Sequence, residues 1–316
     1  MSNPIYNPTY ITAINRALRI VGAYDVSKQP RPEQVNGATE TLCMMLKEWQ
    51  VDNPLWLKTF ATLFLNKGQT SYKLADSANG GDHCATSYVQ TSALNAGNIG
   101  DSAITLTSAA GMTTGDWIGI ADSNGLIEWF TATFSGNMAT LSGTLAAAVN
   151  AGAVIYSHTA ASQIYRPTRV FTAVRKLYDP IADNGIEVEI ELYSRAEYSY
   201  MPNKTVTGKI VQAYYDPQLT AGTLYVWPTA DTPNDKLKLT IDRPIMIPDS
   251  DLDTLDVPME LLDPITFCLA ERLWFEYPGN GADYQILAQR ALIGKEAVTG
   301  YDREMAPTQF QRDWRS

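Results

Sequence analysis

The spacing of apolar residues changes twice along this chain, and no other feature constrains the fold as much. Between residues 9 and 50 apolar side chains recur every three or four positions, as they do on one face of a helix. From residue 57 to about residue 248 the spacing is two, which is typical of strands. Beyond about residue 257 the helical spacing returns. The pattern predicts helices at both ends of the chain and sheets between them.

Each end of the chain carries two expected helices. Residues 9–23 and 32–50 form the first pair, with the turn-rich DVSKQPRPE between them and Pro32 suited to a first helical turn. Residues 259–277 and 282–298 form the second pair. Because short loops join paired helices into hairpins, we expect an α+β fold in which N- and C-terminal helices form a helical bundle core beside a central β region.

An inserted module is expected within the β region. From about residue 75 to residue 161 the composition shifts toward Gly, Ala, Ser, Thr and Asn, with short β-prone runs between turns. The expected division is a helical core of 1–56 and 257–300, a β-rich domain of 57–84 and 162–256, a small all-β insert of 85–161, and an extended C-terminal arm of 301–316.

One strand candidate, Gly185–Tyr193, carries an acidic stripe. Three carboxylates alternate with apolar side chains and therefore share one sheet face; they are Glu187, Glu189 and Glu191. The stripe has two interpretations. It is either an ordinary solvent-exposed sheet face or a negative wall that keeps a passing nucleic acid from sticking.

Composition excludes some classes of protein. A net charge of -10 argues against a protein that grips duplex DNA, because phosphate binding needs clustered Lys and Arg. No apolar run approaches the roughly 18 residues of a membrane span, and MSNPIYNPTY does not read as a secretion signal, so we expect folding in the cytoplasm and no membrane contact. Cys43, Cys84 and Cys268 are widely spaced, as reduced thiols are.

Sequence motifs for catalysis and cofactor binding are missing. The chain has two histidines, His83 and His158, without HExxH, GxSxG or a P-loop. The segment DSDLDTLDVPME imitates a calcium loop, but Thr254 stands where such a loop needs Gly, so a helix-capping acidic loop is the favoured interpretation. We expect no catalytic residue, no metal and no cofactor, and therefore not an enzyme.

Tyrosines and tryptophans are frequent between residues 193 and 227. They could be base-stacking platforms for a nucleic acid. Since Lys and Arg are not interleaved with them, packing in a core or a subunit interface is the favoured interpretation.

Three stretches of the chain resemble a known family. They are ITAINRALRIVGAYDVSKQPRPEQVNGATETLCMMLKEW, SRAEYSYMPNKTVTGKIVQAYYDPQLTAGTLYVWPTADTPNDKLKLTIDRPI and VPMELLDPITFCLAERLWFEY. In their order along the chain, their lengths and their local sequence, the three stretches are similar to the head-to-tail adaptor proteins of short-tailed bacteriophages (podoviruses). These proteins are of the tail accessory factor or packaged-DNA-stabilisation type. The resemblance leaves out the 85–161 insert, which departs from the compact form of the family.

The resemblance implies a structural virion protein of the neck and tail, assembled in the cytoplasm of the host bacterium. A ring of about twelve copies would dock under the portal protein, extend the DNA channel, retain packaged DNA and receive tail nozzle, needle or fibre proteins. The C-terminal arm would insert into the portal through two apolar anchors and three ion-pairing groups. These residues are Phe310 and Trp314, and Arg303, Arg312 and Arg315. Glu187, Glu189 and Glu191 would line the channel beside genomic DNA that is not bound sequence-specifically.

An alternative is a tail-associated protein that binds glycans or degrades cell wall. In that case the β insert would bind the sugar, and Glu187, Glu191 or Asp249 would act as acid and base. A third alternative is another component of the tail machinery with the same helical and β parts.

Overall fold

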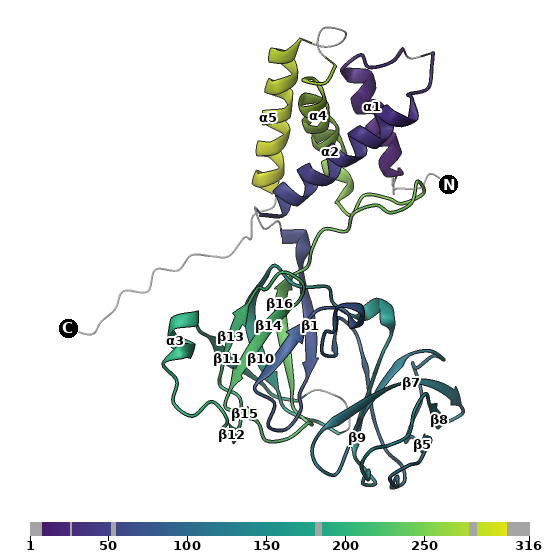
Figure 1. Cartoon of the computed structure of the whole chain (residues 1–316), viewed down its shortest axis with the longest axis vertical. Helices are drawn as coiled ribbons and strands as arrows, with labels where there is room; N and C mark the ends of the chain where they lie inside the picture. The colour runs from purple at the N-terminus through teal and green to yellow at the C-terminus, as the bar shows by residue number, and fades with distance from the viewer. Residues whose placement is uncertain (1–7, 26, 52–54, 181–184, 278–282, 302–316) are drawn as a thin grey trace, which may run out of the picture. The chain divides into compact units, whose positions relative to one another are not determined.

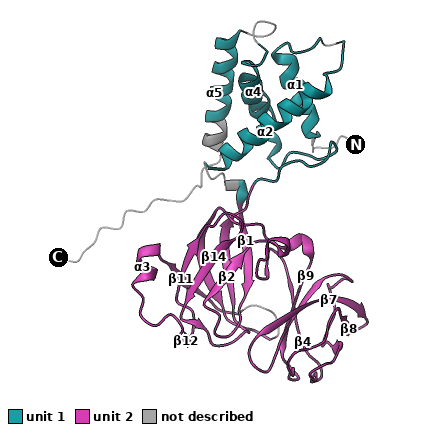
Figure 2. Ribbon diagram, in the orientation of Figure 1, with its two compact units in different colours: residues 1–57, 245–316 teal, residues 58–244 magenta. Residues whose placement is uncertain are grey.

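The computed structural model describes residues 8–25, 27–51, 55–180, 185–277 and 283–301 (Figure 1). The chain divides into two compact units (Figure 2). The first, the helical unit, comprises residues 1–57 and 245–316, and the second, the β unit, comprises residues 58–244. Each unit has hydrophobic core residues of its own.

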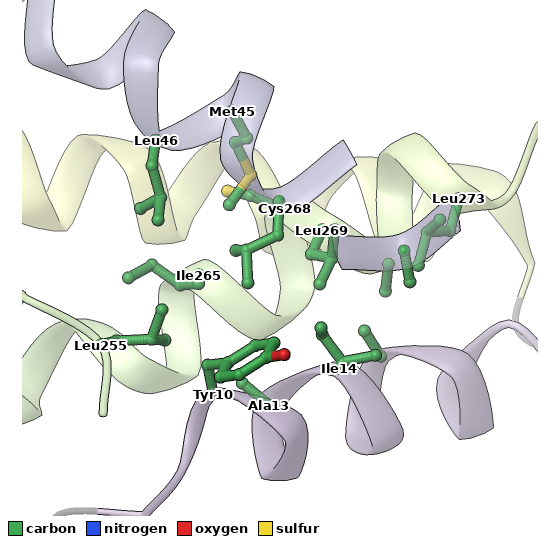
Figure 3. Packing of buried hydrophobic residues seen from close by; sticks show 14 of the residues in the cluster. Tyr10, Ala13, Ile14, Met45, Leu46, Leu255, Ile265, Cys268, Leu269 and Leu273 are labelled. Carbon is green, nitrogen blue, oxygen red and sulfur yellow. The ribbon is translucent and has the colours of Figure 1, made fainter. Parts of the chain in front are cut away.

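The helical unit contains the longer helices of the described chain. They are α1 (Tyr10–Ile20), α2 (Pro32–Val51), α4 (Leu262–Leu273) and α5 (Tyr284–Tyr301), with the short 3-10 turns η1 (Leu55–Leu57) and η4 (Met259–Leu261). Because its apolar residues recur at helical spacing, α1 buries one face, and Ile14 of that face packs near Leu269 of α4 (Figure 3). Met45 and Leu46 of α2 complete this core. No helix in the described part of the chain is long and apolar enough to cross a membrane.

The larger sheet of the β unit has eight strands in the order β2-β14-β13-β11-β10-β16-β1-β3. Their bounds are β1 (Lys58–Phe64), β2 (Ser71–Leu74), β3 (Cys84–Ala85), β10 (Arg169–Lys176), β11 (Glu187–Leu192), β13 (Gln212–Asp216), β14 (Gly222–Trp227) and β16 (Lys236–Asp242). The sheet is mixed, since β11 and β13 run parallel, and it curls nearly into a barrel. Alternate side chains such as Leu63, Ile190 and Leu239 fill its interior. The short strands β12 (Thr207–Gly208) and β15 (Thr229–Ala230) and the helix α3 (Arg195–Ser199) lie in the connections.

The second sheet is antiparallel and has the order β4-β9-β6-β7-β8-β5. Its strands are β4 (Val89–Ser92), β5 (Ala103–Thr105), β6 (Trp117–Ala121), β7 (Ile127–Ser135), β8 (Met138–Leu141) and β9 (Val154–His158), and the turns η2 (Ser77–Asn79) and η3 (Ala160–Ser162) flank it. The ends of its edge strands meet, because Leu94 N–H donates to the Thr105 carbonyl at 2.8 Å and Thr107 N–H donates to the Ser92 carbonyl at 2.9 Å. The sheet therefore closes on itself, and we call residues 89–158 the small barrel.

The expected fold class is wrong. The described structure is mostly β, with a sheet of eight strands and another of six, and only four of its helices reach seven residues or more. Helices did form where the spacing predicted them, but they make a small unit of their own rather than a helical bundle core of an α+β fold. The reason is that the two-residue spacing persists through most of residues 58–244, so that strands pack on strands there and helices do not cover the sheets.

Candidate functional surfaces

The acidic stripe lies on the outer face of the eight-stranded sheet. Glu187, Glu189 and Glu191 of β11 are all exposed, whereas Ile190 points into the sheet interior and is buried. The expected alternation holds at Glu189, Ile190 and Glu191, whereas Val188 is 38% exposed although it falls on the opposite face from the glutamates.

A lysine side chain, Lys238, lies beside the acidic stripe. In the sheet register Glu189 pairs with Val174 of β10, which in turn pairs with Lys238 of β16, so all three share the outer face. The Lys238 ammonium donates to a Glu187 carboxylate oxygen at 3.0 Å and also lies 5.2 Å from the centre of the Phe60 ring. The outer face thus carries charges of both signs next to an aromatic side chain that is 61% exposed.

The predicted arm residues lie beyond the part of the chain that the structure describes. They are Arg303, Phe310, Arg312, Trp314 and Arg315. Their assignment to the portal remains a prediction from the resemblance.

The segment that imitates a calcium loop is a self-capped turn. One carboxylate oxygen of Asp253 accepts hydrogen bonds from the backbone N–H groups of Asp249 and Ser250, both at 2.9 Å. These bonds lower the pKa of Asp253. Among the described residues no three His, Cys, Asp or Glu side chains gather as ligands of a metal ion.

The small barrel covers one end of the outer face of the larger sheet. Phe64 shares that face with Phe60, but Phe64 is buried because three aromatic rings of the barrel side surround it. Its ring centre lies 5.4 Å from Tyr88, 5.2 Å from Trp129 and 4.7 Å from Tyr156. We call this contact the barrel junction, and such aromatic packing stabilises it beyond the area it buries.

A fully buried lysine belongs to the barrel junction. Lys236 of β16 points to the same outer face as the half-exposed Lys238, but the small barrel covers it. Its ammonium lies 5.2 Å from the ring centre of Tyr88 and 5.0 Å from that of Tyr156, and it donates to the Gln90 side-chain oxygen. Ring faces and an amide oxygen thus replace the water that a buried ammonium loses.

The two histidines also meet at the barrel junction, although 75 residues separate them. His83 Nδ1 and His158 Nε2 are 3.0 Å apart, and the His83 ring is stacked on Trp129 with centres 3.8 Å apart and planes 10° apart. Burial, followed by the nearby charge of His158, lowers the pKa of His83 to about 3. Burial likewise lowers the pKa of His158, against opposing effects of the Thr159 carbonyl and Asp116. Sequence reasoning missed this pair, because local spacing does not show which strands become neighbours.

Three of the tyrosines between residues 193 and 227 pack against one another, whereas Tyr200 is 86% exposed. Tyr214 and Tyr225 face each other across β13 and β14 with ring centres 5.8 Å apart, and Tyr198 of α3 stacks on Tyr214 at the same distance. Arg195 fixes this group by donating to the Tyr214 hydroxyl at 2.8 Å and to Asp216 at 2.6 Å. The favoured interpretation of packing is confirmed for these three tyrosines.

The helical unit exposes apolar side chains on α5. Leu287 and Ala291 face inward and are buried, as an amphipathic helix requires. Ile286 and Ile293, which are two helical turns apart on another face, are 62% and 54% exposed. Phe275, just beyond α4, is 66% exposed in the same unit. Gln289 and Arg290 lie between the two isoleucines on that side of α5 and are also exposed, so the surface is mixed.

No protein-family model matches this chain, and no curated protein matches it in sequence.

Proposed function

We propose that this protein is a structural component of a short-tailed phage virion, a head-to-tail adaptor whose copies form a ring under the portal. The resemblance of three sequence stretches motivates the proposal. The structural observation that supports it is the pair of exposed isoleucines on α5, Ile286 and Ile293.

A ring explains why these two isoleucines are exposed. They lie away from the inner face of α5, which is already covered within the helical unit. In a ring, every copy meets a neighbour, so a second copy of this chain would cover Ile286 and Ile293. Full burial of each isoleucine contributes about 1.5–3 kcal/mol, which suits a protein that is soluble alone and assembles on a partner.

The remaining surfaces take the following roles in the proposal. Arg303, Phe310, Arg312, Trp314 and Arg315 of the arm bind the portal. The outer face with Glu187, Glu189 and Glu191 faces the DNA that passes through the channel. This DNA is not bound tightly, which agrees with the protein's net charge of -10. Tail nozzle, needle or fibre proteins attach at the opposite end of the ring.

The test is co-sedimentation of the purified full-length protein with the portal encoded in the same genome, followed by measurement of particle mass. We expect a stable complex with one copy of this chain per portal subunit. The variant I286E/I293E should lose ring formation while its thermal unfolding stays unchanged, because both side chains are exposed in the isolated chain. The double variant N36E/Q285E is the matched control, since Asn36 and Gln285 are exposed in the same unit away from the two isoleucines and the two changes add the same charge.

Two results would contradict the proposal. One is failure of the protein to associate with the portal at micromolar concentration. The other is a ring that forms equally well with I286E/I293E. If F310A/W314A binds the portal as tightly as the unmodified chain does, the arm assignment is wrong while the ring remains.

A further inference from the structure

The two histidines belong to different sheets. The residue before β3, His83, is held to the larger sheet, because its carbonyl accepts a hydrogen bond from the N–H of Phe64 in β1 at 3.3 Å. His158 ends β9 of the small barrel. The rings packed against His83 also come from the barrel: Trp129 of β7 is stacked on it and Trp117 of β6 meets it edge-on. The histidine pair is therefore a direct side-chain link across the barrel junction.

The hydrogen bonds determine which nitrogen carries each proton. His158 Nδ1 lies 3.1 Å from the Thr159 carbonyl, which can only accept, so Nδ1 is protonated and donates. In a neutral ring His158 Nε2 is then unprotonated and accepts, and His83 Nδ1 must donate to it at 3.0 Å. One added proton leaves this bond in place, because a proton on His83 Nε2 keeps Nδ1–H as the donor; only protonation of both rings places two donors face to face.

We propose that His83 and His158 form an acid-sensitive latch that holds the small barrel against the larger sheet. This device is independent of the adaptor role proposed above. When the pH falls, protonation of both rings breaks the bond between them and places two adjacent positive charges in a buried site. The junction then opens, while the separate cores of the sheet and the small barrel remain.

The charged and titratable groups on the elements packed against the pair are Asp82, Cys84, Asp116, Glu128 and Lys236. Asp116 favours protonated His158, but its carboxylate already accepts from the N–H and hydroxyl of Thr113 at 2.7 and 2.9 Å. The Asp82 carboxylate binds the Lys73 N–H, and Glu128 binds the N–H groups of Ala146 and Ala147. All three carboxylates therefore already accept hydrogen bonds from groups other than the two histidines.

The other two groups do not help the latch to bind protons. The Cys84 thiol is buried, and burial raises its pKa, so it stays neutral in acid. The Lys236 ammonium lies in the barrel junction against the Tyr156 ring. Burial of both rings makes a protonated histidine pair unfavourable in the closed state.

The sign of the pH dependence follows from the two states. An exposed histidine has a pKa near 6.5, whereas burial lowers the pKa of His83 to about 3 in the closed junction. The open state therefore binds protons first, and closure is lost as the pH falls below about 6.5. Each protonated histidine raises the opening constant by up to ~10-fold per pH unit.

Hydrogen exchange on the full-length protein at pH 7, 6 and 5 tests the latch. The readout is exchange at two N–H groups whose hydrogen bonds cross the junction, Lys67 to the Gly125 carbonyl at 2.9 Å and Ile127 to the Asn66 side-chain oxygen at 2.8 Å. Each rate is taken relative to H83F/H158F at the same pH, which cancels the intrinsic pH dependence and keeps aromatic rings in both places. We expect this ratio to rise at least ~10-fold from pH 7 to pH 5. The β5–β8 pair inside the small barrel is the internal control and should keep its ratio. A ratio that stays constant at Lys67 and Ile127 overturns the proposal.

Two further measurements keep the proposal testable if H83F/H158F does not fold. The chain has two histidines, so selectively labelled protein gives two ring signals in an NMR titration. Signals that stay neutral below pH 6 until the junction opens support the latch, and signals that titrate near pH 6.5 without opening overturn it. The variant D116N should remain acid-sensitive; loss of the sensitivity there would assign it to Asp116 and overturn the latch as well.

Discussion

Single residues explain how closely the barrel junction is packed. Gly119 of β6 lies under Trp129, and a Cβ built on Gly119 would come within 2.7 Å of three atoms of the indole. His83 is stacked on Trp129 at 3.8 Å, so the indole has little room to move. The absence of a side chain at position 119 is therefore a condition for the stack.

We expect G119A to destabilise the β unit. The added methyl group must displace Trp129, and such overpacking costs about 1–3 kcal/mol. Urea unfolding followed by tryptophan fluorescence measures the loss. An unchanged unfolding midpoint would mean that the indole is free to shift.

Gly37 is the contrasting position. It lies inside α2, and a Cβ there would meet nothing within 4 Å in the described structure. Because alanine restricts the unfolded chain and favours a helix, G37A should raise the free energy of unfolding by about 0.5–1 kcal/mol. Thermal unfolding of the isolated protein measures this gain, and a loss would show that the position is crowded.

Among the secondary-structure elements, α3 depends most clearly on its cap. Ser194 N–H donates to the Glu197 carboxylate at 2.7 Å, and Glu197 N–H donates to the Ser194 hydroxyl at 3.3 Å. The hydrogen bonds from Ser194 also lower the pKa of Glu197, so this cap weakens as acid protonates the carboxylate. Through Tyr198, α3 covers the paired tyrosines of β13 and β14.

We expect S194A to reduce the stability of α3 by about 0.5–2 kcal/mol, because one backbone N–H loses its acceptor. Faster hydrogen exchange in Arg195–Ser199 would report this loss. S199A is the control, since the Ser199 hydroxyl only donates back to the Arg195 carbonyl and caps nothing. Equal exchange in the two variants would exclude a role for the cap.

At the level of the whole molecule, the β unit is an insertion into a helical unit. Lys58 and Asp242 are paired residues of neighbouring antiparallel strands, so the chain enters and leaves the β unit at adjacent points. Opposite residues in such a pair lie about 5 Å apart. A few glycines can therefore bridge residues 57 and 245.

We expect each unit to fold when the other is removed. Residues 58–244 alone should give the circular dichroism of a β protein with its own cooperative melting, because the cores of both its sheets lie inside that range. The remaining residues, joined by a glycine linker, should give a helical spectrum. Loss of cooperative melting in either fragment would show that its core needs the other unit.

Much of the secondary structure could be predicted, because it depends on spacing within a few residues. The helix of Pro32–Val51 and the alternation in Glu187–Leu192 follow from such patterns. The fold class could not be predicted in this way. Whether helices cover a sheet or a sheet closes on its own interior depends on strand order, which a local pattern does not contain.

The candidate surfaces also separate into features that a local pattern predicts and features that depend on which strands become neighbours. The sequence alone determined that Glu187, Glu189 and Glu191 share a face, since alternation in a strand is a local property. Only the tertiary structure decided that Lys236 is buried while Lys238 of the same strand is half exposed, and that His83 meets His158. Both outcomes arise where the small barrel covers the larger sheet, and contacts between segments so far apart in the chain are set by packing rather than by spacing.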